Sequence, residues 1–195
     1  MGRHQTTIGP NYFEDMFQQT HDPWELETSP YEQAKFADSI AALSGRTYAQ
    51  ALEVGCAKGV LTSQLAEWCG ALLAIDVSET ALAAAQQRLT DAPHVEFERM
   101  AFPGDAPDRQ FDLVVLSEVA YYWNDPDLKR SASWLKSHMV PGGDILLVHF
   151  TGETDYPQTG DGAADMLIEL TSPIMGLIAS QRREHYRLDI LRRTS

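Results

Sequence analysis

The sequence has few cysteines and no long apolar run. Only two of its 195 residues are cysteine, Cys56 and Cys69, too few for a disulfide framework and typical of a protein whose thiols stay reduced. No run of 18 or more apolar residues occurs, so we expect no membrane span. Residues 1–5 lack the apolar stretch of a secretory signal. Together these absences favour a cytoplasmic protein.

Positive charge is also scarce. Lys and Arg number 15 against 28 Asp and Glu, which gives a formal net charge of −13. An acidic surface repels phosphate groups, so neither nucleic acid nor an anionic membrane is an expected partner. The six histidines are scattered, with no carboxylate or cysteine at ligand spacing, and we expect no metal site. We expect a monomer or homodimer that acts on a small molecule.

Strand-like and helix-like segments alternate along most of the chain. Strands are expected at 48–54, 71–76, 94–98, 111–116 and 144–150, with helices at 60–69, 79–89 and about 124–139. Such alternation predicts a parallel sheet with right-handed crossovers. A further helix at about 161–170 precedes two strand-like runs, 175–182 and 186–191, whose direct connection requires an antiparallel hairpin. The expected fold is therefore α/β, with a mostly parallel seven-stranded sheet and one antiparallel edge strand.

A helical segment precedes this core. Tyr12, Phe13, Met16 and Phe17 fall at helical spacing, which predicts a helix capped by Asn11 and running to about residue 20. A second helix is expected from Pro30 to about Ser44, because Ser29 and Glu32 form a capping-box pattern. The length suits one domain. We interpret residues 1–45 as a helical lid segment and residues 46–195 as a cofactor-binding core.

The stretch from Ala51 to Thr62 combines a buried strand, a small-residue turn and the start of a helix. Backbone N–H groups and the positive end of a helix meet at such a turn, which attracts an anion or a carboxylate. The turn reads Gly55-x-Ala57-x-Gly59 and so differs from the dinucleotide pattern G-x-G-x-x-G. Asp76 ends the next strand, where a carboxylate can accept hydrogen bonds from ribose hydroxyls.

These features, with Ser117-Glu118 after the fourth strand and Pro141-Gly142-Gly143 before the fifth, resemble the class I S-adenosylmethionine-dependent methyltransferases from about residue 45 onward. The resemblance implies a Rossmann-like three-layer fold and S-adenosylmethionine as cofactor, with S-adenosylhomocysteine as product. It assigns the ribose to Asp76 and the adenine face to Val77. It assigns the rest of the cofactor to a further set of residues: Glu53, Gly55, Cys56, Ala57, Gly59, Ser117 and Glu118.

The stretch after the third strand departs from the family pattern. Many members carry an acid there that meets the adenine amino group, whereas this sequence has Arg99-Met100-Ala101-Phe102 and no acid before Asp105. Two readings stay open. Either the backbone of Ala101 and Phe102 contacts adenine, or Asp105 reaches back to it.

Several segments are similar to one branch, the NodS N-methyltransferases, which methylate the free amine of a deacetylated chitooligosaccharide in nodulation-factor synthesis. They are Asp22-Pro23-Trp24, Ser29-Pro30-Tyr31-Glu32, Ala51 to Cys56 and Ser117 to Tyr122. The resemblance implies N-methylation of an amine on a sugar or other polar small molecule. Trp24 and Tyr31 are candidates for a lid over the cofactor. Four residues are candidates for catalysis on the carboxyl rim of the sheet: Glu118, Tyr121, Tyr122 and His149.

Structural interpretations stand beside these assignments. Tyr121 and Tyr122 could pack under a loop, His149 could be a buried strand-end histidine, and Cys56 is better explained as a small turn residue than as a nucleophile. The alternative activity is a small-molecule O-methyltransferase of secondary metabolism. An NAD-dependent oxidoreductase and a non-catalytic relative that keeps the cofactor site are further alternatives, the first disfavoured by the missing G-x-G-x-x-G and by the terminal hairpin.

Overall fold

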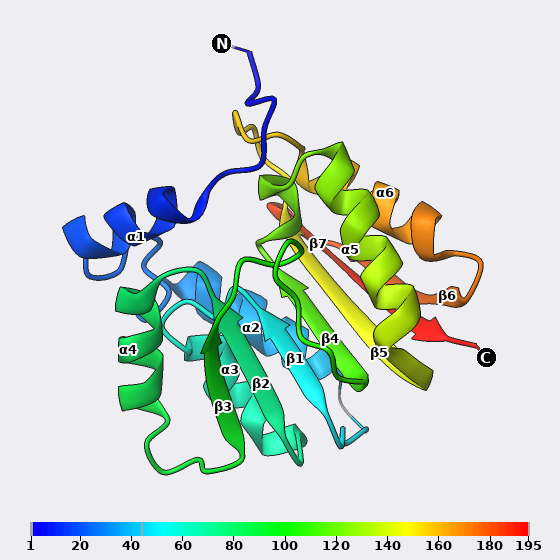
Figure 1. The fold of residues 1–195 in the computed structure, drawn as a ribbon, viewed down its shortest axis with the longest axis horizontal. Coiled ribbons are helices and arrows are strands. Elements are labelled where there is room, and N and C mark those ends of the chain that lie inside the picture. The colour runs from blue at the N-terminus through cyan, green and yellow to red at the C-terminus, as the bar shows by residue number, and fades with distance from the viewer. Residues whose placement is uncertain (1, 44, 195) are drawn as a thin grey trace. The chain divides into compact units, whose positions relative to one another are not determined.

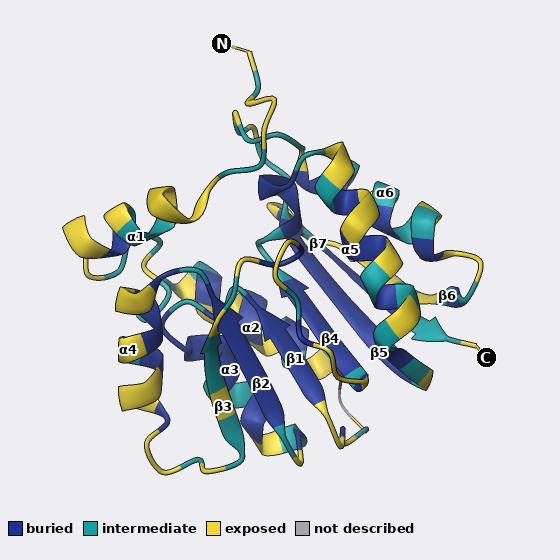
Figure 2. Cartoon of the chain, in the orientation of Figure 1, coloured by how far each residue is buried: buried dark blue, intermediate teal, exposed yellow. Residues whose placement is uncertain are grey.

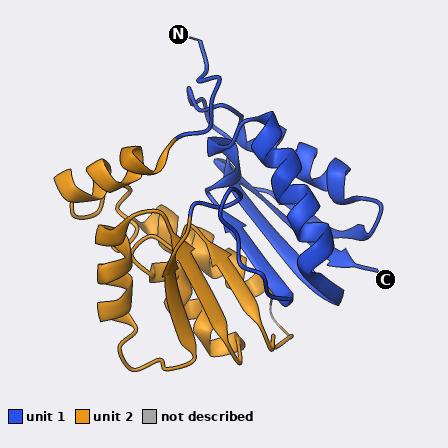
Figure 3. Cartoon of the chain, in the orientation of Figure 1, with its two compact units in different colours: residues 1–8, 101–195 blue, residues 9–100 orange. Residues whose placement is uncertain are grey.

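Residues 2–43 and 45–194 are described by a computed structural model (Figure 1). The chain packs into two compact units (Figure 3): residues 9–100 form one, which we call the N-unit, and residues 1–8 with 101–195 form the other, which we call the C-unit. Each unit carries part of the sheet and its own helices. No helix in the described ranges combines the length and the apolarity needed to span a membrane.

The N-unit contains three parallel strands, β1 (Ala51–Val54), β2 (Leu72–Asp76) and β3 (Val95–Arg99). Every residue of β1 and β2 is buried, whereas β3 has no buried residue (Figure 2). The continuous apolar run of β2 predicts a strand that is buried on both faces, and the polar–apolar alternation of β3 predicts a more exposed strand. The helices of this unit are α1 (Pro10–Gln19), α2 (Pro30–Leu43), α3 (Val60–Leu65), η1 (Ala66–Trp68) and α4 (Glu79–Arg88).

The C-unit contains β4 (Phe111–Ser117), β5 (Met139–Phe150), β6 (Met175–Arg182) and β7 (Tyr186–Arg193). Strands β4 and β5 are parallel, and β7 is antiparallel to both β5 and β6. The strand β7 therefore inserts between β5 and β6, and β6 lies at the edge. The helices of this unit are η2 (Ala120–Tyr122), α5 (Asp125–His138) and α6 (Gly160–Thr171).

The predicted fold class is confirmed. The seven strands form one mixed, mostly parallel sheet in the order β3-β2-β1-β4-β5-β7-β6, and the terminal hairpin supplies its antiparallel strand. Strand β1 is shorter than predicted, and residue 48 makes only an isolated bridge to Cys69. The single-domain organisation with a lid at residues 1–45 stays a prediction.

Capping explains where the helices begin. The Ser78 hydroxyl accepts a hydrogen bond from the Ala81 N–H at the start of α4, and the Asn124 side chain accepts one from the Asp127 N–H at the start of α5. The predicted cap of α1 is wrong. The helix begins at Pro10 with Gly9 as the N-cap, because proline suits the first helical turn, where no N–H donor is needed. The predicted end of α2, Ser44, lies outside the described residues.

Candidate functional site

The loop after β1 is shaped by left-handed backbone conformations. Gly55 has φ of +75°, Ala57 +47° and Gly59 +76°, a region that glycine adopts freely and alanine only at a cost. The N–H groups of Gly55 and Cys56 donate to the Ile75 carbonyl at 2.8 and 3.0 Å, so β2 fixes the start of the loop. A strained backbone outside glycine is a mark of functional sites, and here it falls on the loop predicted to bind the cofactor.

Gly59 is also required for packing. A Cβ atom at this position would lie 3.0 Å from the Ala85 Cβ and 3.1 Å from a methyl carbon of Leu89. The glycine therefore lets the loop approach the last turns of α4 closely. Its predicted place in the cofactor loop stands beside this structural role.

Asp76 joins the loop to the next turn. Its Oδ2 accepts a hydrogen bond from the Ala57 N–H at 2.9 Å, and its Oδ1 accepts one from the Ser78 N–H at 2.9 Å. The side chain is buried, with the residue 8% exposed. Burial raises the pKa of Asp76, while the backbone donors oppose that shift. One carboxylate thus sets the geometry of both loops that the sequence assigns to the cofactor.

Glu53 is a buried acid on β1, only 2% exposed. Burial raises its pKa to about 7, against the influence of the neighbouring Thr62 hydroxyl and with that of the Asp76 charge. Within the described part of the chain, neither Glu53 Oε2 nor Thr62 Oγ1 has a hydrogen-bond partner of standard geometry. A buried polar pair of this kind needs an explanation, and a polar ligand group is one.

Cys56 and Val77 complete the N-unit set. The Cys56 side chain packs against Ala74 and Leu82, and burial raises the pKa of its thiol well above the usual range, so it does not act as a nucleophile. The Val77 side chain is half-buried, and its carbonyl accepts a hydrogen bond from Arg99 Nε at 3.1 Å. Arg99, in the stretch that lacks the acid of the family pattern, therefore stabilises the turn after β2.

In the C-unit, Glu118 lies just after β4 with φ of +59°. Its N–H donates to the Val148 carbonyl at 2.8 Å. Its Oε2 accepts hydrogen bonds from the Tyr121 hydroxyl at 2.7 Å and from the Phe150 N–H at 3.0 Å. A non-glycine residue held in the left-handed region by several bonds is typical of a functional position. Ser117, the last residue of β4, is half-buried beside it in sequence.

Tyr121 and Tyr122 pack in a group of three tyrosine rings. Their centroids lie 4.7 Å apart, and the Tyr156 ring lies 5.4 Å from Tyr121 and 4.6 Å from Tyr122. Both tyrosines of the pair are buried, and burial raises the pKa of each phenol well above its usual value. Both therefore stay neutral hydrogen-bond donors near pH 7. The third ring, in the segment after β5, was missed because nothing in the sequence pairs it with η2.

His149 is fully buried at the end of β5. Its Nε2 accepts a hydrogen bond from the Ala120 N–H at 3.3 Å. A backbone N–H can only donate, so Nε2 carries no proton and the neutral ring carries its proton on Nδ1. His149 thus positions η2, which is the structural interpretation that the sequence leaves open.

The adenine-side residues differ in exposure. Ala101 is exposed, whereas Phe102 is buried, with its ring 5.4 Å from that of Trp123 and 5.1 Å from that of Trp134. The Phe102 side chain is thus a core aromatic, which leaves its backbone for any ligand contact. Asp105 is exposed, and its N–H donates to the Ala101 carbonyl at 3.0 Å.

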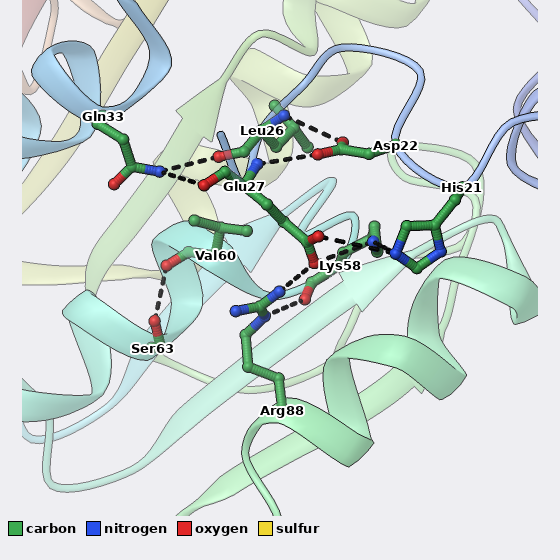
Figure 4. A network of polar contacts seen from close by, with 9 residues as sticks. All are labelled: His21, Asp22, Leu26, Glu27, Gln33, Lys58, Val60, Ser63 and Arg88. Atoms are coloured by element: carbon green, nitrogen blue, oxygen red, sulfur yellow. Dashed lines mark hydrogen bonds and ion pairs between the residues drawn. The ribbon is translucent and has the colours of Figure 1, made fainter. Parts of the chain in front are cut away.

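Trp24 and Tyr31, the two candidate lid residues, are both half-buried, and the Trp24 ring lies edge-on to Phe17 at 5.4 Å. The same segment carries an acid that sequence reasoning missed. Glu27 pairs with Lys58 of the cofactor loop at 2.9 Å and with Arg88 at the end of α4 (Figure 4). A lone acid 31 positions before its lysine has no signal in the sequence.

The structure therefore groups the predicted residues within each unit. In the N-unit, Glu53, the 55–59 loop and Asp76 lie together; in the C-unit, Glu118, Tyr121, Tyr122 and His149 do so. In residues 2–43 and 45–194, no group of three or more His, Cys, Asp or Glu side chains is arranged to hold a metal ion.

Known proteins resemble the chain in sequence. Nodulation protein S from Sinorhizobium fredii (strain NBRC 101917 / NGR234) is 35% identical over 127 residues, which is 64% of this chain and 59% of that protein. Nodulation protein S from Bradyrhizobium diazoefficiens is 38% identical over 106 residues, 53% of this chain and 50% of that protein. The matched segments thus span between half and three-fifths of these relatives' own length.

Solved structures resemble it in fold. The N-methyltransferase NodS from Bradyrhizobium japonicum WM9, in complex with S-adenosyl-L-homocysteine, superposes with a TM-score of 0.82 at 22% identity, covering 96% of this chain and all of that one. A putative methyltransferase from Pseudomonas syringae superposes with a TM-score of 0.74 at 34% identity, covering 84% of this chain and 99% of that one.

The family model described as Nodulation protein S (NodS) matches residues 14–147. This range includes the second half of α1, the Gly55–Gly59 loop, Asp76 and the Glu118–Tyr122 turn, and it is more than half of the 195 residues. The chain therefore belongs to the NodS family.

Proposed function

We propose that the chain is an S-adenosylmethionine-dependent methyltransferase that N-methylates an amine on a sugar or another polar small molecule. The observation that carries this proposal is the carboxylate of Asp76, which orders the Ala57 and Ser78 N–H groups at the end of two parallel strands. Open α/β sheets bind nucleotides at that edge. Membership of the NodS family supports the same activity, as does the fold shared with NodS in complex with S-adenosyl-L-homocysteine.

The N-unit residues suit the cofactor. Asp76 holds the ribose hydroxyls, Val77 lies against adenine, and the loop of Gly55, Ala57 and Gly59 receives the amino-acid part. Glu53 offers a buried carboxyl oxygen without a protein partner of standard geometry in the described chain. A ligand ammonium group beside Glu53 would favour the ionised form of its carboxyl. Because the pKa of Glu53 is about 7, a small change in its environment is enough to ionise it at neutral pH.

When bound, the cofactor supplies a methyl group already activated on a sulfonium. Transfer of that methyl group to the amine would leave S-adenosylhomocysteine, and the nitrogen would have to lose one proton. The protein then has to orient the amine, exclude water and accept that proton or pass it to solvent. Glu118 suits the orienting role, because its carboxylate is fixed by Tyr121 and by the Phe150 N–H.

The acceptor is proposed from charge and family. A net charge of −13 favours a neutral or cationic acceptor over an anionic one. The NodS family suggests an amino sugar or an oligosaccharide with a free amine. We expect no nucleic acid or membrane partner, and either a monomer or a homodimer in the cytoplasm.

Two measurements test this function. Isothermal titration should show binding of S-adenosylhomocysteine and none of NAD. Transfer of a labelled methyl group from S-adenosylmethionine should then occur to glucosamine or to a chitooligosaccharide with a free terminal amine. If only phenols or carboxylates accept the methyl group, the proposed activity is wrong and the chain is an O-methyltransferase. Cofactor binding without transfer to any class of acceptor would instead indicate a non-catalytic relative.

A further inference from the structure

Two acids in the segment from α1 to the start of α2 bind the two loops of the predicted cofactor site, which are the Gly55–Gly59 loop and the turn between β2 and α4. The first is Glu14 on α1. Its Oε2 accepts a hydrogen bond from the Ser78 hydroxyl at 2.6 Å and its Oε1 accepts one from the Thr80 hydroxyl at 2.6 Å. The Thr80 N–H donates to the same carboxylate at 3.3 Å. Glu14 thus binds the first turn of α4, two residues after Asp76.

The second acid is Glu27 (Figure 4). Its Oε1 lies 2.9 Å from Lys58 Nζ and also pairs with Arg88. Arg88 Nε donates to the Lys58 carbonyl at 2.9 Å, and Lys58 Nζ lies 2.8 Å from the Nε2 of His21. Glu27 therefore holds the Gly55–Gly59 loop at Lys58 in two ways. It pairs directly with the Lys58 ammonium group, and it pairs with Arg88, which bonds the Lys58 carbonyl.

The segment around Glu27 is itself built to present that side chain. Asp22 accepts hydrogen bonds from the N–H groups of Leu26 and Glu27 at 3.0 and 2.9 Å. Gln33 of α2 donates its side-chain amide to the carbonyl of Leu26 at 3.0 Å and to that of Glu27 at 3.4 Å. The backbone is fixed on both sides of the acid, so the side chain loses little further freedom on pairing with Lys58 (Figure 4).

The electrostatics make the contact between Glu27 and Lys58 costly to lose. The Lys58 side chain is only 3% exposed, so removal of its carboxylate partner leaves a buried ammonium group without its counter-charge. Lys58, with Arg88 and His21 in support, lowers the pKa of Glu27. The hydroxyls of Ser78 and Thr80 lower the pKa of Glu14 to about 2. Both acids are therefore ionised at neutral pH.

We propose that Glu14 and Glu27 are positioning residues of the cofactor site, which act through the β2–α4 turn and the Gly55–Gly59 loop rather than by touching the cofactor. Asp76 bonds both Ala57 and Ser78, so displacement of either loop changes the donors around one carboxylate. This inference rests on the proposed cofactor. It adds that the segment before the core determines the affinity for that cofactor.

The test measures the dissociation constant of S-adenosylhomocysteine by isothermal titration on the full chain. Glu27→Gln and Glu14→Gln should each weaken binding about tenfold, because each removes a charged group whose bonds fix one loop. The controls are Glu25→Gln and Asp15→Asn, which remove one exposed charge from the same segments and should change affinity less than about twofold.

The outcomes separate the inference from the function on which it rests. If the unmodified chain does not bind S-adenosylhomocysteine, the proposed function fails and this inference falls with it. If the chain binds while both glutamine variants bind equally well, the inference alone is overturned. The same holds if the variants lower the melting temperature but leave affinity and KM for S-adenosylmethionine unchanged, since that is a purely structural role.

Milder variants keep the test decisive if a glutamine variant does not fold. Thr80→Val removes one donor to Glu14 and keeps the Ser78 cap, whereas Arg88→Gln removes both the ion pair with Glu27 and the hydrogen bond to the Lys58 carbonyl. Thr80→Val should weaken binding about threefold, the effect of losing one bond of a set, and Arg88→Gln should weaken it by about threefold to tenfold because two contacts are lost. Each should also raise KM for S-adenosylmethionine with kcat unchanged, as expected of loss of uniform binding. Unchanged affinity in both would overturn the inference.

Discussion

The cofactor loop of the N-unit and the Glu118–Tyr122 turn of the C-unit both follow a buried parallel strand, yet they treat their polar groups differently. In the first, a buried carboxylate arranges backbone donors, and Glu53 Oε2 has no partner of standard geometry within the described residues. In the second, the Glu118 carboxylate accepts from Tyr121 and Phe150, and His149 accepts from Ala120.

Under the proposed function, this difference favours ligand binding at the first loop and positioning of the acceptor at the second turn. A buried acid with an oxygen that lacks a partner of standard geometry, such as Glu53 on β1, gains free energy when a ligand supplies a donor. A turn whose acid and imidazole are already bonded is rigid before any ligand arrives, which favours orientation of an acceptor over proton transfer by freely available groups.

The largest effect concerns Glu53 and pH. Its pKa is about 7 in the folded chain against 4.5 for the ordinary carboxyl, so the folded state holds a proton that the unfolded state has lost between these values. Stability should therefore fall as pH rises through this window, by roughly 2–3 kcal/mol from pH 5 to pH 8 for this group. Glu53→Gln should remove that part of the fall.

Denaturant unfolding of both proteins at pH 5 and pH 8 measures this. The relevant quantity is the difference between the variant and the unmodified chain, because other titrating groups cancel in it. A difference that is the same at both pH values would mean that Glu53 is not the buried acid described here. Addition of S-adenosylhomocysteine at pH 8 should reduce the cost, since a ligand ammonium favours the ionised carboxyl.

Asp76→Ala comes next. It removes the acceptor for the Ala57 and Ser78 N–H groups and the proposed partner of the ribose, so S-adenosylhomocysteine affinity should fall by about 1.5–2.5 kcal/mol. Isothermal titration measures the loss. Asp91→Ala, at an exposed position of the same unit, is the matched control. An unchanged dissociation constant in Asp76→Ala would show that this residue is not part of the cofactor site. The contrast between the Gly55–Gly59 loop and the Glu118–Tyr122 turn would then no longer hold.

Much of the architecture could be predicted from the sequence because its signals are local. The apolar run ending at Asp76, the serine before α4 and the asparagine before α5 each act within a few residues. The hairpin at the C-terminus follows from two strand-like runs with a short connection. The start of α1 was misplaced because Asn11 competes with Pro10, and proline at the first turn prevailed.

The missing parts depend on long-range contacts. Glu14 lies 64 positions before Ser78, and Glu27 lies 61 positions before Arg88. No local sequence pattern links residues so far apart in the chain, so from the sequence each acid is indistinguishable from an ordinary exposed charge on a helix or turn. The Tyr156 ring stacks on Tyr121 across a loop whose conformation the sequence does not specify. The cofactor role of the Gly55–Gly59 loop stays a prediction from residue type, whereas the contacts that hold this loop are visible only in the packed chain.

The third prediction concerns Glu118. Glu118→Gln keeps an acceptor for the Phe150 N–H but removes the negative charge, so an amine is no longer oriented by that charge. With an amino-sugar acceptor, kcat should fall about tenfold while KM for S-adenosylmethionine changes less than about twofold. Glu153→Gln, an exposed acid in the segment after β5, serves as control. Full activity in Glu118→Gln would leave the turn with a structural role only.

The smallest effect is expected at His149. Its Nε2 accepts from the Ala120 N–H, so proton uptake at that nitrogen would break the bond that holds η2. His149→Gln places an amide oxygen where Nε2 lies and keeps an acceptor for this donor, and kcat should therefore stay within about threefold of the value for the unmodified chain. Loss of a general base would instead cost about a hundredfold or more. Steady-state rates across pH 6 to 9 separate the two, because removal of a base also removes its limb of the pH profile. A hundredfold loss with the acidic limb abolished would show that His149 gives up its bond to Ala120 during turnover, and the two turns would then differ less in chemistry than their resting geometry indicates.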